Sequence, residues 1–315
     1  MRRSLRLRTR EPERPKASVL GATPAGIALS TALAARFGQV SIWEPDPDIG
    51  RPLRGRPGIA AVSADLADSV RDSAFVGCAV LRRDLDATLE AVGPHLVHGA
   101  IVLIATIGHE AAHASAARLL PGHVSVACFT TFPPPECTGP RERRDRATNA
   151  AAGISPASGA HQDAVGVIQA IIEATGAVPF FGEAREIDGL AAASLALPSI
   201  VGAAVVRATI ANQSARDLDR AGSECLAAVT SVLDLAPPTP EDLQAIAEHV
   251  ARLLRDAASD LLDIASGLDD AVPDVAAVAP AADRRRAWLA ARATPEDAVA
   301  TIRDAPRPAR RRFFF

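Results

Sequence analysis

The stretch KASVLGATPAGIALSTALAARFGQVSIWEPDPD, residues Lys16–Asp48, decides the fold that we expect for this chain. An apolar strand comes first, and a glycine turn, a helix and a second strand follow, at Ala17–Leu20, Gly21–Gly26, Ile27–Phe37 and Val40–Trp43. Gly38 is placed to end the helix, and Glu44 ends the second strand. This order, with an acid about 20 residues beyond the glycines, is the one that a dinucleotide-binding fold requires.

Each type of residue in such a turn has a physical reason to be there. Gly21 lets the chain turn sharply, and the helix start after Gly26 directs free N–H groups at a diphosphate. Glu44 can accept hydrogen bonds from ribose hydroxyls. We therefore expect cofactor contacts from the turn, from Glu44 and from the end of a later strand, at Gly21, Ala22, Thr23, Pro24, Ala25, Gly26, Glu44, Ala79 and Val80. The alternative is an α/β unit with a tight turn and no nucleotide.

The turn departs from the usual pattern at its middle position, where Thr23 replaces a glycine. Its Cβ crowds the diphosphate, whereas Pro24 costs little because the first turn of a helix does not use that N–H. Glu44 and Asp46 would repel a 2′-phosphate, so we expect NAD rather than NADP. Arg51 and Arg54 follow closely and weaken this preference.

The composition is that of a globular protein of 315 residues, long enough for two domains. A formal net charge of −3 gives no support for a nucleic-acid partner. Basic residues gather near both ends, so we expect a disordered tail over 1–15 and a mostly disordered one over 276–315.

No stretch has the pattern of a signal peptide, and no apolar run is long and uninterrupted enough to span a bilayer. Four cysteines are scattered without C-x-x-C spacing, at Cys78, Cys128, Cys137 and Cys225. We expect them to be reduced thiols in a cytoplasmic protein that does not contact a membrane.

Strands and helices alternate along the first half of the chain. Buried strands are predicted at Ala74–Leu81, His98–Thr106, Val124–Phe129 and Ala177–Phe181, with helices at Asp84–Val92, Glu110–Leu120 and Asp163–Thr175. Pro140–Ala160 interrupts this rhythm and reads as a mobile loop, with Ala151–Pro156 as a late piece at the sheet edge. The pattern predicts an α/β fold, with a Rossmann-type parallel sheet domain over 16–182.

Helices follow one another from 183 to 275, and we expect a separate helical domain there. Ile187–Leu197 and Pro198–Asn212 are nearly apolar all round, which places them inside a domain or against another subunit. Pro198 would start the second of these helices or kink the pair. Asp217–Leu235 and Pro240–Asp269 are predicted to be long amphipathic helices.

From Lys16 to Leu268 the chain resembles the prephenate/arogenate dehydrogenases, a tyrosine-biosynthesis branch of the 6-phosphogluconate-dehydrogenase-like proteins. Three segments carry the resemblance: DSAFVGCAVLRRDLDATLEAVGPHLVHGAIVLIAT, EATGAVPFFGEAREIDGLAAASLALPSIVGAAVV and SARDLDRA. The resemblance implies a homodimer formed through the helical domain, and NAD(P)-linked oxidation of a ring alcohol with loss of CO₂. It also implies that Arg216 helps to hold the substrate carboxylate. The competing reading of Arg216 is an ion pair on a helix surface.

Three polar positions of that family are changed here. Thr130, Thr131 and Phe132 stand where a catalytic His is expected, and Thr106-Ile107-Gly108-His109 replaces a Ser-x-Lys segment. The family's His-Leu-Pro-His has become Ala196-Leu197-Pro198-Ser199. General acid–base catalysis usually contributes about 10²–10⁴-fold, so the ordinary reaction needs a substitute group.

His109 is the best substitute base, because it follows the carboxyl end of a predicted strand. Its alternative is a helix-start histidine that faces solvent. Thr106 and Thr130 can hydrogen-bond the nicotinamide or the substrate. His109 and His113 also spell HEAAH, the zinc-peptidase pattern, but no third ligand is apparent, and we expect no metal.

We therefore expect an NAD(P)-dependent oxidoreductase that transfers a hydride from a small carboxylate-bearing alcohol. Two rivals stay open. One is a related dehydrogenase or imine reductase of the same group that acts on another acid. The other is a catalytically silent NAD-binding regulatory protein, which the missing family histidines favour.

Overall fold

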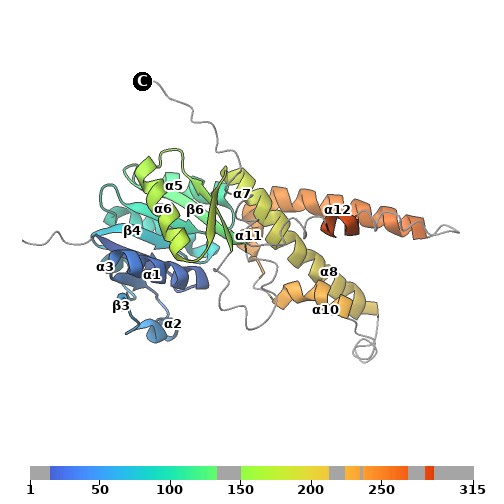
Figure 1. Ribbon diagram of the computed structural model, residues 1–315, viewed down its shortest axis with the longest axis horizontal. Helices are drawn as coiled ribbons and strands as arrows, with labels where there is room; N and C mark the ends of the chain where they lie inside the picture. The colour runs from blue at the N-terminus through green and yellow to red at the C-terminus, as the bar shows by residue number, and fades with distance from the viewer. Residues whose placement is uncertain (1–14, 133–149, 213–223, 235–236, 269–280, 287–315) are drawn as a thin grey trace, which may run out of the picture. The chain divides into compact units, whose positions relative to one another are not determined.

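The computed structural model describes residues 15–132, 150–212, 224–234, 237–268 and 281–286 (Figure 1). Most of the expected tails over 1–15 and 276–315 therefore lies outside the described residues. Arg216 lies outside them too, as do residues 217–223 and 235 of the helix expected at Asp217–Leu235, whose described part, 224–234, is helical.

The sheet has eight strands in the order β3-β2-β1-β4-β5-β6-β7-β8. Their bounds are β1 (Lys16–Leu20), β2 (Val40–Trp43), β3 (Ile59–Ser63), β4 (Ser73–Cys78), β5 (Ile101–Ala105), β6 (Ser125–Phe132), β7 (Ala151–Pro156) and β8 (Val178–Phe181). The pairs β1–β2, β1–β4, β2–β3, β4–β5 and β7–β8 are parallel. This mostly parallel sheet, followed by helices, confirms the expected fold class.

Two compact units divide the chain. The first comprises residues 1–105, 113–127 and 156–175, and the second comprises 106–112, 128–155 and 176–315. The helices of the first unit are α1 (Pro24–Phe37), α2 (Pro47–Gly50), α3 (Leu66–Val70), α4 (Leu85–Val92), most of α5 (His109–Leu119) and α6 (Gln162–Ala174), with short 3₁₀ turns η1 (Arg51–Leu53), η2 (Arg82–Asp84) and η3 (Gly93–His95).

Helix α1 forms where the sequence predicted a helix, although it begins earlier, at Pro24. Thr23 is its N-cap, since the hydroxyl accepts a hydrogen bond from the N–H of Gly26. Gly38 ends it with a φ of 88°, and its N–H donates to Ala34 O. The buried side chains of Leu29 and Leu33 fix α1 against the unit's core.

The sequence predicted a mobile loop over Pro140–Ala160 with a piece at the sheet edge. Residues 140–149 lie outside the described residues, and β7 corrects the prediction for the edge piece. Ala151–Pro156 is a buried strand between β6 and β8, and β8 is the edge. The strand was hard to predict because it is built from small residues. Gly153 shows why: a Cβ there would lie 2.8 Å from Ile187 Cδ1 and 3.0 Å from the Phe180 ring.

The helices of the second unit are α7 (Ala184–Ala191), a π-helical turn η5 (Ala192–Ala196), α8 (Leu197–Asn212), α10 (Glu224–Thr230), α11 (Pro240–Ala245) and α12 (Ala247–Leu268), with a 3₁₀ turn η6 (Ser231–Asp234). The second of the two apolar helices, α8, begins at Leu197, one residue before the expected start at Pro198. α7, η5 and α8 run on without interruption, because the π-helical turn precedes Pro198 and accommodates its missing N–H.

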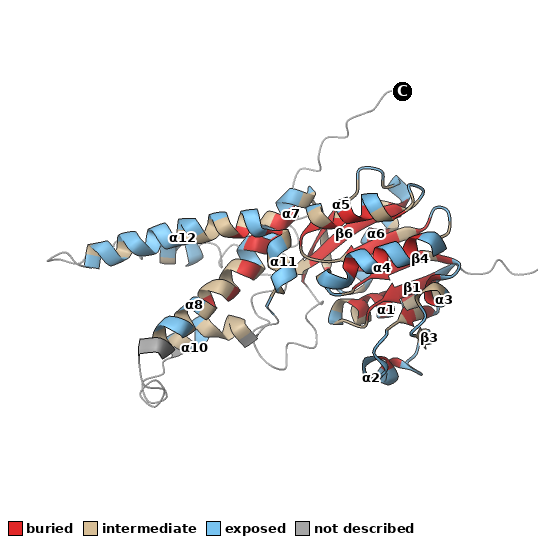
Figure 2. Cartoon of the chain, turned by 180° about the vertical axis from the view of Figure 1, so that it is seen from behind, coloured by how far each residue is buried: buried red, intermediate tan, exposed pale blue. Residues whose placement is uncertain are grey.

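The sequence predicted a single helix at Pro240–Asp269, and this prediction is wrong. The segment forms two helices, because Ile246 separates α11 from α12 with a φ of −117°. Ile246 and Val250 join the alanines of α7 and η5 in one buried cluster, Ala191, Ala192, Ala196, Ile246 and Val250. Figure 2 shows exposed residues along most of α12 beyond this cluster.

By length and composition, Ala184–Thr209 is the one helix among the described residues that is apolar enough to cross a membrane. Only 28% of its most apolar 18-residue window is buried. We expected this segment to be buried inside a domain or against another subunit, and burial inside the chain holds for its first part, which belongs to the buried cluster.

Candidate functional site

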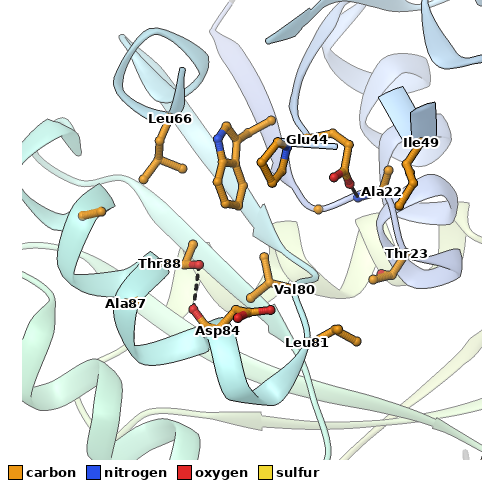
Figure 3. Close-up of a pocket in the computed structure, with 14 residues that line it drawn as sticks. Ala22, Thr23, Glu44, Ile49, Leu66, Val80, Leu81, Asp84, Ala87 and Thr88 are labelled. Atoms are coloured by element: carbon orange, nitrogen blue, oxygen red, sulfur yellow. Dashed lines mark hydrogen bonds between the residues drawn. The ribbon is translucent and has the colours of Figure 1, made fainter. Parts of the chain in front are cut away.

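A pocket of about 630 Å³ lies in the first unit, where β1, β2 and β4 end. We call it the Glu44 pocket. Gly21, Ala22 and Thr23 line it from the turn after β1, and Trp43 and Glu44 line it from the end of β2. Its other walls come from the start of α3, the segment after β4, and α4, through Leu66, Val80, Leu81, Asp84 and Thr88 (Figure 3). Ligands bind at this edge in open α/β sheets.

The glycines of the turn are required by close backbone contacts. Gly21 has a φ of 89°, and a Cβ there would lie 2.6 Å from Ala79 O. A Cβ on Gly26 would lie 2.1 Å from Gly21 O. The turn is therefore as tight as the sequence predicted, and no side chain fits at either position.

Thr23 and Glu44 are both held by the backbone of the turn. The Thr23 hydroxyl donates to Ala79 O at 2.8 Å and accepts from Gly26 N at 3.3 Å. Glu44 Oε2 accepts from Ala22 N at 2.9 Å, and Oε1 accepts from Asp46 N at 3.0 Å. Figure 3 shows the carboxylate directed at Ala22. Its remaining lone pairs can accept hydrogen bonds from a ligand.

The nine residues expected to contact a cofactor lie close together, but they do not all face the pocket. Gly21, Ala22, Thr23, Glu44 and Val80 line it. The others, Pro24, Ala25, Gly26 and Ala79, belong to the turn, to the first turn of α1 or to the segment after β4.

The pocket fits a dinucleotide, but with few backbone donors for its diphosphate. Pro24 has no N–H, the N–H of Gly26 is bonded to Thr23, and the N–H of Ala22 is bonded to Glu44. Within the described residues, the N–H of Ala25 makes no hydrogen bond and is free for an anion. No basic side chain lines the pocket in the described part of the chain, whereas Glu44 and Asp84 do.

A second polar cluster lies in the second unit around His109, the first residue of α5. The imidazole is fully buried, so the alternative of a solvent-facing histidine is wrong. Nδ1 lies 2.7 Å from Ser155 Oγ, and Nε2 lies 2.9 Å from Thr130 Oγ1. Thr130 and Ser155 are buried as well, at the ends of β6 and β7.

The direction of the hydrogen bond between His109 Nε2 and Thr130 Oγ1 follows from the second contact of that hydroxyl, with the carbonyl oxygen of Thr106. Thr130 Oγ1 donates to Thr106 O, which can only accept. Thr130 therefore accepts from His109 Nε2–H, and a neutral ring leaves its lone pair on Nδ1, facing Ser155. A substrate hydroxyl would not touch the ring directly in this arrangement.

Asp188 of α7 completes the cluster. Its Oδ1 accepts from His109 N at 2.6 Å, and its Oδ2 accepts from Glu110 N at 3.0 Å, so the carboxylate caps α5. Burial raises the pKa of Asp188 above its ordinary value, although the two N–H groups act to lower it. Sequence reasoning missed Asp188 and Ser155, because they lie 79 and 46 residues from His109.

The remaining predicted positions are placed as follows. The Thr106 hydroxyl donates to Ile107 O at 2.8 Å, and Phe132 lies with its ring centroid 6.1 Å from that of Phe180. No group of three or more His, Cys, Asp or Glu side chains within the described ranges could hold a metal ion. Arg216, the expected substrate anchor, lies outside the described residues.

No protein-family model and no curated protein sequence matches this chain. Solved structures do, and they share the architecture of dinucleotide-binding dehydrogenases with a helical region after the sheet. That fold is, more narrowly, the fold of the prephenate and arogenate dehydrogenases, as the sequence resemblance implied.

Three of these structures define the likeness. Prephenate dehydrogenase from Aquifex aeolicus, in complex with hydroxyphenyl propionate and NAD+, has a TM-score of 0.74 at 12% identity, over 89% of this chain and 100% of that one. Arogenate dehydrogenase from Synechocystis has a TM-score of 0.69 at 16% identity, over 87% and 99%. A putative prephenate dehydrogenase from Corynebacterium glutamicum has 0.73 at 17% identity, over 90% of both chains.

Proposed function

We propose that this chain is an NAD-dependent oxidoreductase that removes a hydride from a small carboxylate-bearing alcohol. The Glu44 pocket carries the proposal, because a tight glycine turn, a helix start and a fixed carboxylate meet at the ligand-binding edge of the sheet. Residues 16–182 would form the dinucleotide-binding domain and 183–275 the helical one. Prephenate or arogenate is the leading substrate by fold, which would place the protein in tyrosine biosynthesis in the cytoplasm.

The cofactor would be held mainly by the turn and by Glu44. The turn from Gly21 to Gly26 would face the diphosphate, Glu44 the ribose hydroxyls, and Ala79 and Val80 the nicotinamide side. NAD would supply the hydride acceptor when bound. The absence of basic side chains among the described lining residues supports NAD over NADP, since a 2′-phosphate would meet Glu44 and Asp84 without a counter-charge.

The substrate would be anchored by Arg216 and oriented by the polar cluster. We assign Thr106 and Thr130 to contacts with substrate or nicotinamide, and His109 to the proton transfer. Because Nε2 carries the proton towards Thr130, the basic lone pair of His109 lies on Nδ1, facing Ser155, and the ring can accept a proton at Nε2 only if its own proton moves to Nδ1 once the substrate is bound. Catalytic hydrogen bonds often form fully only in the substrate complex.

The uncovered apolar part of α8 supports a homodimer. Most of the apolar window within Ala184–Thr209 is not buried in the single chain, and a second copy would cover it.

The complete burial of His109 favours one other candidate function. An NAD-binding regulatory protein without turnover would need the pocket but no accessible base, and His109, which follows β5 and contacts Thr130 of β6, is enclosed. Nucleotide binding without oxidation of any carboxylate tested would support this candidate.

Binding is tested by titration with NAD and NADP. Trp43 lines the pocket, so its fluorescence should change on binding, and a Trp43→Phe variant identifies the signal against the second tryptophan of the chain. Glu44→Gln removes a charge-assisted acceptor, worth about 1.5–3 kcal/mol, and should weaken NAD about tenfold or more. Glu90→Gln, on the exposed face of α4, is the matched control and should change nothing.

Turnover is tested by NADH absorbance with prephenate and arogenate. Loss of a measurable activity in His109→Ala, with NAD affinity intact, would support the assigned base. No affinity for either nucleotide would refute the proposed function.

A further inference from the structure

A smaller cavity, of about 200 Å³, lies wholly within the second unit beside the π-helical turn. We call it the Asp242 cavity. Ile107, Leu195 and Val232 supply apolar wall, and Ser199 and Asp242 supply polar groups. π-helical turns are rare and are frequently found at functional sites. Ile107 and Ser199 also belong to two of the three segments in which this chain departs from the family it resembles.

Two of the polar side chains that line the cavity, Ser199 and Asp242, present hydrogen-bond acceptors, and the hydroxyl of exposed Ser194 can donate as well as accept. The Ser199 hydroxyl, which is buried, donates its proton to Leu195 O at 2.9 Å, so only its lone pairs are left. Asp242 Oδ2 accepts from the N–H and the hydroxyl of Thr239, both at 2.9 Å. Oδ1 of Asp242 makes no hydrogen bond or ion pair with any described residue.

The charge of the cavity is negative. Asp242 is the only ionisable side chain among the described lining residues, and no Lys, Arg or His lies there to balance it. A ligand group that pairs with Ser199 and Asp242 therefore has to donate hydrogen bonds, and it gains most if it carries a positive charge.

We propose that the Asp242 cavity binds a cationic nitrogen, an ammonium or iminium group, whose apolar substituent packs on Ile107, Leu195 and Val232. Its volume is below the 300–1,000 Å³ that is usual for a whole ligand, so it takes a head group of a few atoms. The inference rests on the proposed function in one respect: it makes the substrate of that enzyme a nitrogen compound.

The test uses isobutylamine as probe, with isobutanol and isobutyrate as isosteres, on the full chain. Binding is followed by saturation-transfer NMR at about 0.15 M salt, which screens weak contacts with surface carboxylates. We expect the amine to bind at least tenfold more tightly than either isostere. Asp242→Asn keeps an oxygen for Thr239 and should lose that preference.

Two further variants separate the cavity from general effects. Glu241→Gln removes a neighbouring exposed charge in the same helical turn and should leave amine binding unchanged. Ser199→Ala removes the second acceptor and should weaken the amine a few-fold, without affecting the Thr239–Asp242 cap. Equal binding of amine and isobutyrate, or an Asp242→Asn variant that binds the amine like the wild type, overturns the inference.

The outcomes are distinguishable from those of the proposed function. NAD affinity without amine binding refutes only the Asp242 cavity as a nitrogen site. Amine binding that Asp242→Asn abolishes, in a chain without affinity for NAD or NADP, supports the cavity and refutes the enzyme.

Discussion

Replacing Asp188 by alanine should destabilise the protein more than any exposed substitution, because it leaves two buried N–H groups without acceptors. Asp188 is 1% exposed and accepts from the backbone of His109 and Glu110. Hydrogen bonds to a charged group contribute about 1.5–3 kcal/mol each, and the burial cost of the charge offsets part of this sum. We expect Asp188→Ala to lower the free energy of unfolding by about 3 kcal/mol at pH 7.

Asparagine at this position is the informative intermediate. Asp188→Asn keeps one acceptor oxygen and gives up the charge, so it should cost about half as much as alanine. Glu248→Ala removes an exposed pair with Arg185, in which the side chains are 80% and 63% exposed, and is the matched control. Exposed pairs of this kind contribute about 0–1 kcal/mol.

The pH dependence follows from the raised pKa of Asp188. The folded protein retains this proton at pH values where the unfolded chain, with the ordinary value of 3.8, has released it. The contribution of Asp188 to stability is therefore fully present below the unfolded value and declines as the pH rises through the folded one. The cost of Asp188→Ala should be larger at pH 4 than at pH 7.

The assay is urea unfolding, followed by far-UV circular dichroism and by Trp43 fluorescence, together with hydrogen exchange. The amides of His109 and Glu110 should exchange faster in Asp188→Ala than in the wild type, while those of α12 should not. A cost at pH 7 no greater than that of Glu248→Ala, or unchanged exchange at the start of α5, would refute the reasoning.

Three other substitutions or reactions are expected to have clear outcomes. Thr23→Gly removes the side chain that crowds the turn, so the dissociation constant of NAD in the fluorescence titration should fall several-fold. The same variant loses the hydrogen bond from the Thr23 hydroxyl to Ala79 O, which should lower the free energy of unfolding by about 1 kcal/mol. Gly108 has a φ of 85°, and a Cβ there would lie 2.4 Å from Ala245 Cβ, so Gly108→Ala should lower the free energy of unfolding by more than about 1 kcal/mol. Gly122→Ala places its Cβ in open space and should lower it by less than about 0.5 kcal/mol. Burial raises the pKa of the Cys78 thiol to about 12, so iodoacetamide at pH 8 should label exposed Cys225 and spare Cys78, as mass spectrometry will show.

The sequence was most informative where local chemistry determines the chain's path. The first strand, turn, helix and second strand could be predicted because Gly21, Gly26 and Gly38 each have a steric reason to be glycine. β7 could not be predicted in the same way. Its Ala and Gly residues have low strand propensity, and its place in the sheet depends on pairing with β8 and on the small volume that Ile187 leaves.

Only those residues of the candidate site that lie at a fixed sequence spacing from a recognisable motif could be predicted. Glu44 was found because its spacing from the glycines is fixed by one strand–helix–strand unit. Ser155 and Asp188 have no such spacing, since they meet His109 through the packing of β7 and α7. For the same reason, the alternative of a solvent-facing His109 is wrong: a residue after a strand end is exposed only if no later segment covers it.

The described charged side chains that line the Glu44 pocket and the Asp242 cavity are acidic, which limits how either can bind an anion. Glu44 and Asp84 line one, Asp242 lines the other, and no basic side chain of the described residues lines either. A diphosphate or a substrate carboxylate must therefore be held by backbone N–H groups such as that of Ala25, or by residues outside the described ranges, for which Arg216 is the proposed one. Because salt screens repulsion between like charges, NAD affinity should hold or rise between about 0.05 and 0.5 M salt in the Trp43 titration. A steep fall with salt would mean that cations from outside the described ranges dominate the pocket, and that its preference for NAD over NADP does not follow from Glu44.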